Sequence, residues 1–176
     1  MKIYNFSPKI IFLTGLSSSG KTTLGNLLKN KLKLMGIKSI HIDGDKFRKK
    51  FKLNKYDPKS RINVAIKKFT YGNQFLKKNK MVIISGVAAK LKSRKILKRK
   101  FKDYIEVKLN CPLKICISRD KKKNIYSNNK NLNFVNLKYQ KGNTHDISVN
   151  TFKNKKNQNV KSIINYLKKK RVIYLS

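Results

Sequence analysis

The stretch IIFLTGLSSSGKTTLGNLLK at residues 10–29 constrains the fold more than any other feature of this sequence. A short apolar run leads into a loop rich in glycine and serine, and leucines at helical spacing follow the loop. The loop matches G-x-x-x-x-G-K-[ST], a pattern in which backbone N–H groups and the start of the next helix capture phosphate. Strand, loop and helix occur in the order that this chemistry requires. The stretch therefore predicts a nucleotide-phosphate site built on a parallel sheet.

The residues of this loop have separate expected roles. Gly20 lets the backbone approach the phosphates without a Cβ in the way. Lys21 is predicted to be catalytic because its amine can reach the β- and γ-phosphates, and the hydroxyl of Thr22 is predicted to ligate Mg²⁺. The predicted ATP-binding residues of the loop are Gly15, Leu16, Ser17, Ser18, Ser19, Gly20, Lys21, Thr22 and Thr23.

Further strands and helices alternate along the rest of the chain. We expect strands within 36–43, at 81–87, at 104–110 and at 147–151, with helical patterns between them. This alternation predicts a single α/β domain over 1–176, with a parallel sheet of about five strands and helices on both faces. Ligands then bind beyond the carboxyl ends of the strands. The asparagine-rich stretch within 121–145 lacks periodicity and is predicted to be a loop, with a mobile lid as a candidate role.

The composition is strongly basic, with 45 Lys+Arg against 7 Asp+Glu and a formal net charge of +38. Such a balance is typical of proteins with anionic partners, including nucleic acids. The charge is spread along the whole chain, however, which favours compositional drift over a dedicated nucleic-acid surface. A basic nucleic-acid-binding ATPase stays as the alternative from another class. Cys111 and Cys116 lack metal-binding spacing, and no apolar stretch is long enough to cross a membrane, so we expect a cytoplasmic protein without a membrane partner.

The carboxylates are few enough to be considered one by one. The expected strand at 81–87 ends in IISG and offers none, whereas the strand before it ends in IDGD, with Asp43 and Asp45 on either side of Gly44. Phosphoryl transfer needs a carboxylate near Mg²⁺ and the acceptor, and these two are well placed for it. The alternative is structural: Asp43 ends the strand and Asp45 caps the next helix.

Several segments in order carry a resemblance to a known family: GLSSSGKTTL, HIDGDKFR, KYDPKSR, CPLKICISRD, NIY, FVN and ISVNT. The series resembles adenylyl-sulfate kinase, which uses ATP to phosphorylate the ribose 3′-hydroxyl of adenylyl sulfate in sulfate assimilation. The resemblance covers nearly the whole chain. It implies the P-loop kinase fold, phosphotransfer to an alcohol group, ATP and Mg²⁺ as cofactors and a small nucleotide as partner, without a specific nucleic acid. A homodimer is left open.

The resemblance also implies roles for the two acids and for an arginine on the donor side. Asp45 matches the second acid of D-G-D and is expected to act at the acceptor hydroxyl as a catalytic residue. Asp43 matches the first acid and is expected in the Mg²⁺–water network. Arg119 matches an arginine beside the ATP base.

On the acceptor side, Arg48 and Arg61 match two arginines that hold the phosphosulfate of the substrate. Tyr56 and Phe134 match two aromatic residues that sandwich its base. These residue types suit the task, because guanidinium groups bind oxyanions and rings stack on bases.

Three departures from the family pattern lie on this acceptor side. Ala88 and Ala89 replace a serine and a proline, Val64 stands where an asparagine is expected, and F-T-G has become FVN. The matching arginines and aromatic residues predict adenylyl sulfate as the acceptor. The three departures leave another nucleotide diphosphate, such as cytidine diphosphoramidate, as the alternative.

Overall fold

The computed structural model describes residues 3–120, 126, 139–140, 142 and 144–176, and contains the predicted five-stranded parallel sheet. The strand order is β3-β4-β2-β5-β6, with every neighbouring pair parallel. The elements are β1 (Tyr4–Phe6), β2 (Ile10–Thr14), α1 (Lys21–Leu34), β3 (Ser39–Asp43), α2 (Gly44–Lys50), α3 (Pro58–Leu76), β4 (Met81–Gly86), α4 (Leu91–Lys100), β5 (Tyr104–Asn110), α5 (Leu113–Ser118), β6 (Ile147–Asn150), α7 (Lys156–Lys169) and β7 (Ile173–Leu175).

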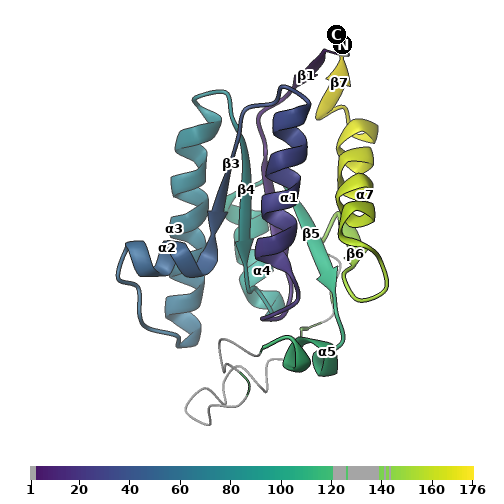
Figure 1. The fold of residues 1–176 in the computed structure, drawn as a ribbon. Coiled ribbons are helices and arrows are strands. Elements are labelled where there is room, and N and C mark those ends of the chain that lie inside the picture. The colour runs from purple at the N-terminus through teal and green to yellow at the C-terminus, as the bar shows by residue number, and fades with distance from the viewer. Residues whose placement is uncertain (1–2, 121–125, 127–138, 141, 143) are drawn as a thin grey trace.

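Helices cover both faces of the sheet, as predicted (Figure 1). The central strand β2 is buried throughout, and its side chains alternate between two cores. Ile11 and Leu13 pack with leucines of α1 and with α7, whereas Ile10 and Phe12 pack with α2, α3 and α4. The apolar run that feeds the phosphate loop is therefore fixed on both sides, which holds the loop in place.

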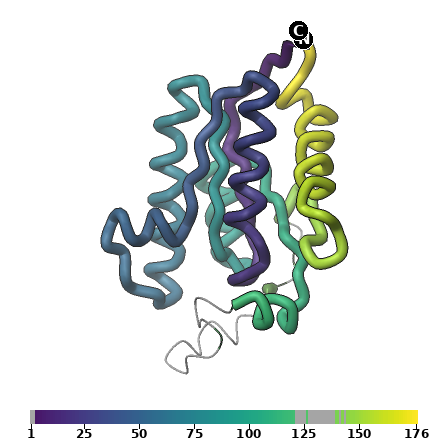
Figure 2. The backbone as a smooth tube through the Cα atoms, viewed as in Figure 1, coloured from purple at the N-terminus to yellow at the C-terminus, as the bar shows by residue number. Residues whose placement is uncertain are grey.

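The first and last described strands, β1 and β7, lie together and far from the phosphate loop (Figure 2). Here β1 and β7 form a two-stranded antiparallel sheet, which the sequence analysis did not predict. The loop between β2 and α1 lies at the other end, together with α5 (Figure 1). No helix in the described part of the chain is both long and apolar enough to span a membrane.

The predicted strand boundaries need small corrections. The turn and strand expected within 36–43 are confirmed: Gly36 adopts a positive φ of 74° in the turn after α1, and the strand runs from Ser39 to Asp43. The strand expected at 81–87 ends at Gly86, and the one expected at 147–151 ends at Asn150. Most of the predicted lid falls outside the described residues.

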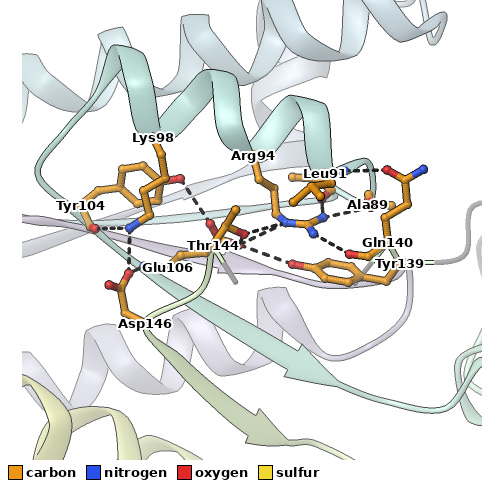
Figure 3. A network of polar contacts seen from close by, with 11 residues as sticks. Ala89, Leu91, Arg94, Lys98, Tyr104, Glu106, Tyr139, Gln140, Thr144 and Asp146 are labelled. Atoms are coloured by element: carbon orange, nitrogen blue, oxygen red, sulfur yellow. Dashed lines mark hydrogen bonds and ion pairs between the residues drawn. The ribbon is translucent and has the colours of Figure 1, made fainter. Parts of the chain in front are cut away.

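A buried polar network fixes Tyr139, Gln140, Thr144 and Asp146 against α4 and β5 (Figure 3). Its centre is the ion pair between Arg94 and Glu106, whose side chains are fully buried, with Nε and Oε1 3.6 Å apart. The same guanidinium donates to the carbonyl groups of Ala88 and Ala89, at 2.8 and 2.9 Å. Thr144 joins the network by accepting from Arg94 and donating to Glu106. The segment after β4 is thus held by its backbone, and Glu106 serves the fold.

Candidate active site

A cavity of about 870 Å³ opens at the carboxyl ends of the strands, where the fold predicts ligand binding. It collects most of the predicted residues into one site. The predicted residues that line it are Ser17, Ser18, Gly20, Lys21, Thr22, Thr23, Asp43, Asp45, Arg48, Tyr56, Arg61 and Arg119. Phe134 lies outside the described residues, so its pairing with Tyr56 stays a prediction.

The two glycines of the phosphate loop serve different purposes. Gly20 has a φ of 93°, a conformation that L side chains rarely adopt, and it directly precedes α1. A Cβ on Gly15 would instead lie 2.9 Å from Oγ of Ser19 and 3.0 Å from the carbonyl oxygen of Leu109. Gly15 is therefore required for packing against β5, and Gly20 for the backbone turn into the helix.

The start of α1 meets the end of β3 at the donor end of the cavity. The hydroxyl of Thr22 donates to Oδ2 of Asp43 at 2.6 Å, and Lys21, next to it, donates to the carbonyl oxygen of Leu16 within the loop. A hydroxyl and a carboxylate in contact are hard oxygen ligands of the kind that Mg²⁺ prefers when phosphates supply further ligands. The pair thus fits the predicted metal role. No cluster of three or more acidic, histidine or cysteine side chains that could hold a metal by itself occurs among the described residues.

Asp43 also caps α2, which corrects the structural alternative that gave the cap to Asp45. Its Oδ1 accepts from the backbone N–H groups of Asp45 and Lys46, at 3.1 and 3.0 Å. Burial raises the pKa of Asp43, but the hydrogen bonds from Thr22 and from these N–H groups outweigh burial and hold the pKa below its ordinary value. The Asp43 carboxylate is thus ionised. One of its oxygens accepts hydrogen bonds at the start of α2, and the other contacts Thr22 after the phosphate loop. Asp45 follows in the first turn of α2 and lines the cavity.

A further set of polar side chains, from β4, β3 and α1, is connected to Asp43 by hydrogen bonds. The Ser85 hydroxyl donates to Oδ2 of Asp43 at 3.3 Å and lies 3.1 Å from Nε2 of His41. Nδ1 of His41 is 2.8 Å from Oδ1 of Asn26 on α1. Burial lowers the pKa of His41 against the opposing charge of Asp43. Ser85 sits at the end of β4 and faces the site, whereas His41 has a supporting role.

The two predicted arginines line the same cavity. The guanidinium of Arg48 lies 4.4 Å from the centre of the Tyr56 ring and donates to the carbonyl oxygens of Leu53 and Lys55. Arg61 lies in the first turns of α3, which Asp57 caps, and donates to the carbonyl oxygen of Tyr56. Burial lowers the pKa of both guanidinium groups, yet an arginine stays charged at neutral pH.

The residues that depart from the family pattern differ in whether they line the cavity. Val64 lines the cavity, so an apolar side chain replaces a polar one where the acceptor would bind. Ala88 and Ala89 are buried, and neither is among the cavity residues. The replacement of serine and proline at these two positions therefore changes buried residues that do not line the cavity.

Arg119 lines the cavity and donates to the carbonyl oxygen of Thr151. Thr151 lines the cavity together with Asn154, Lys156 and Asn159, which the sequence analysis did not single out as site residues. The signal that could have found them is the position of the ISVNT segment, because its strand ends at the same edge of the sheet as the phosphate loop.

The sequence analysis also missed Lys68, a buried lysine on α3 with 6% of its surface exposed. Its amine reaches the cavity between the first residue of α2 and the last residue of β4: a Cβ on Gly44 would lie 3.3 Å from Nζ, and a Cβ on Gly86 would overlap it. Burial and the charge of Arg48 lower the pKa of Lys68 to about 8, against the opposing charges of Asp45 and Asp43. The helical spacing from Val64 is the only signal in the sequence that this lysine faces inward.

The sequence is similar to those of known kinases. The sequence model described as adenylylsulphate kinase matches residues 7–150. The chain is 34% identical to the cytidine diphosphoramidate kinase of Campylobacter jejuni over 116 residues, 66% of this chain and 68% of that protein. It is 28% identical to the adenylyl-sulfate kinase of Clostridium acetobutylicum over 173 residues, 93% of this chain and 85% of that protein.

The fold is similarly close to solved structures. The Mycobacterium tuberculosis APS kinase CysC, in a structure with AMPPNP and APS, superposes with a TM-score of 0.83 at 20% identity, covering 93% of this chain and 99% of that one. This likeness supports the P-loop kinase fold. Because the family match spans well over half of the sequence, the chain belongs to the adenylylsulphate kinase family and is a nucleotide kinase that phosphorylates a hydroxyl acceptor.

Proposed function

We propose that the protein transfers the γ-phosphoryl group of ATP to the ribose 3′-hydroxyl of adenylyl sulfate, as a cytoplasmic step of sulfate assimilation. The observation that carries this proposal is the arrangement of one cavity. Residues of the phosphate loop, the Thr22–Asp43 contact, Arg48, Arg61 and Asp45 all line this one cavity. A donor phosphate and an anionic acceptor thus each have a charged binding region, with a carboxylate in the same cavity.

In this proposal the residues that bind ATP and the residue that acts on the acceptor hydroxyl have separate roles. Lys21 and the backbone of the loop hold the β- and γ-phosphates and stabilise charge in the transition state. Thr22 and Asp43 would hold Mg²⁺, and the bound ion would neutralise negative charge on the phosphate oxygens. Asp45 orients the acceptor hydroxyl and accepts its proton.

Arg48 and Arg61 hold the phosphosulfate through charged hydrogen bonds. Tyr56 stacks on the base, with Phe134 as its expected partner. In the structure the Tyr56 ring lies against Arg48, so binding of a base on that face requires the ring to turn or the base to take the opposite face.

Cytidine diphosphoramidate is the second candidate acceptor. The Campylobacter jejuni kinase named for that compound is 34% identical to this chain, against 28% for the Clostridium acetobutylicum adenylyl-sulfate kinase. The apolar Val64 also lines the acceptor end, where a polar side chain would be needed to recognise the edge of adenine.

An ADP-release assay with purified protein, ATP and Mg²⁺ separates these possibilities. We expect turnover to start on addition of adenylyl sulfate, and cytidine diphosphoramidate and plain nucleoside diphosphates serve as competing acceptors. DNA and RNA form a separate arm, because a nucleic-acid-dependent ATPase would respond to them in a salt-dependent way. A clear preference for the cytidine compound would replace the proposed acceptor, and stimulation by nucleic acid alone would contradict the proposal.

A further inference from the structure

The amine of Lys68 occupies space that two glycines leave open. Lys68 lies midway along α3, on the face that packs against β4, yet its side chain crosses to the ends of β3 and β4. A Cβ on Gly86 would overlap Nζ, and the next atom of the side chain, Cε, would be 3.7 Å from that Cβ. The absence of a side chain at residue 86 therefore makes room for the ammonium group at the edge of the cavity.

This ammonium group lacks a partner in the described part of the chain. Lys68 forms no hydrogen bond or ion pair with any described residue, although 94% of its surface is buried. Asp43 and Asp45 attract it from a distance, and Arg48 repels it. Nζ keeps some accessible surface at the cavity, and an anion that binds there would compensate a charge that the described residues leave without a direct partner.

The surrounding charges indicate where such an anion would lie. Arg48 and Arg61 line the same end of the cavity, and both are partly removed from water. Lys68 and Arg48 both interact electrostatically with Asp45, the carboxylate expected at the acceptor hydroxyl, and Arg61 lies close enough to Arg48 to feel its charge. A lysine contributes a compact charge with three donors on a flexible stem, which suits a phosphate oxygen that the rigid guanidinium forks do not reach.

We infer that Lys68 is a binding residue for an anionic phosphate group of the acceptor, and that it selects acceptors with a charged tail over neutral alcohols. This inference deepens the proposed function and rests on it for the identity of the acceptor. Arg48 and Arg61 then hold the outer part of the tail, and Lys68 holds the phosphate nearest the acceptor hydroxyl.

The test compares Lys68→Met with Lys67→Met. The two substitutions remove the same charge from adjacent positions of α3, but Lys67 is exposed. We expect Lys68→Met to raise the KM for the acceptor about ten- to a hundredfold, the range for a lost charged hydrogen bond, and to leave the KM for ATP within about twofold. Lys67→Met should change neither value, and inhibition by free adenosine, which has no charged tail, should be the same in all three proteins.

A second variant changes the position of the Lys68 amine and keeps its charge. Gly86→Ala should displace the flexible end of Lys68 without changing any charge, so it should also raise the KM for the acceptor. If Lys68→Met does not fold, Lys68→Gln removes the charge and keeps a polar end. An unchanged KM for the acceptor in a folded Lys68 variant would overturn the inference and leave the proposed function standing.

A binding measurement covers the case in which no acceptor is turned over. With the donor site saturated by a non-hydrolysable ATP analogue, inorganic pyrophosphate is titrated into each protein by calorimetry. We expect the wild type and Lys67→Met to bind it with equal affinity and Lys68→Met to bind it at least about tenfold more weakly. Equal affinity in all three would overturn the role of Lys68, whereas absence of turnover with weakened pyrophosphate binding would overturn only the proposed acceptor.

Discussion

The buried charge of Lys68 should destabilise the fold at neutral pH, and Lys68→Met should remove that cost. The lowering of the pKa from 10.5 to about 8 measures how much the native surroundings disfavour the charged form. At about 1.4 kcal/mol per pKa unit, the cost is about 3 kcal/mol. Methionine has a similar length and no charge, so we expect the free energy of unfolding at pH 7 to rise by up to about this amount.

The dependence on pH has a definite sign. Native Lys68 releases its proton near pH 8, whereas in the unfolded chain it keeps the proton up to its ordinary pKa of 10.5. Between these values the unfolded state binds more protons, so Lys68 makes the free energy of unfolding rise with pH, by about 2 kcal/mol at pH 9.5. The advantage of Lys68→Met over the wild type should therefore shrink from pH 7 to pH 9.5.

Urea unfolding followed by circular dichroism at pH 7 and pH 9.5 measures both effects. Lys67→Met is the matched control, and it should differ from the wild type by less than about 0.5 kcal/mol at either pH. Lower stability of Lys68→Met at pH 7, or an advantage that does not change with pH, would refute the reasoning. In the first case Lys68 contributes more through packing or polar contacts than its burial costs.

Three further substitutions test other parts of the account. Lys21→Ala should lower kcat at least about a hundredfold in a protein with an unchanged circular dichroism spectrum, because a charge that stabilises the transition state is lost, and near-normal turnover would exclude this role. Asp45→Asn should lower kcat about a hundredfold or more while ATP affinity in calorimetry stays within about twofold, and weakened ATP binding with normal kcat would move Asp45 to the donor side. Glu106→Gln should destabilise the fold by about 3 kcal/mol in urea unfolding, because Arg94 loses its buried counter-ion (Figure 3), and a change below about 1 kcal/mol would show that neutral partners suffice.

The donor end of the site could be predicted from the sequence because its determinants are local. The residues from Ile10 to Thr23 contain the strand, the loop and the start of the helix, and IDGD ends the strand that follows. The closeness of Thr22 and Asp43 then follows from a parallel sheet, in which strand ends share one edge. What the sequence did not indicate is that Asp43 would cap α2 with one oxygen and meet Thr22 with the other.

The position of the Lys68 amine could not be predicted, because it depends on contacts between distant elements. Helical spacing places Lys68 on the inner face of α3, but the space for its amine comes from Gly44 and Gly86 on two other elements. The same holds for the β1–β7 pair, whose short strands come from opposite ends of the chain. The stacking of Tyr56 on Arg48 likewise depends on the path of the segment between α2 and α3.

Identification of the reaction product tests the central claim most directly. The protein is incubated with ATP, Mg²⁺ and adenylyl sulfate, and the nucleotides are then separated. Their masses are measured by mass spectrometry, and the position of the new phosphate is determined by ³¹P NMR. The account predicts one phosphorylated acceptor for each ADP formed, with the new phosphate on the ribose 3′-oxygen. Release of inorganic phosphate with every ADP, without a phosphorylated acceptor from either adenylyl sulfate or cytidine diphosphoramidate, would contradict it.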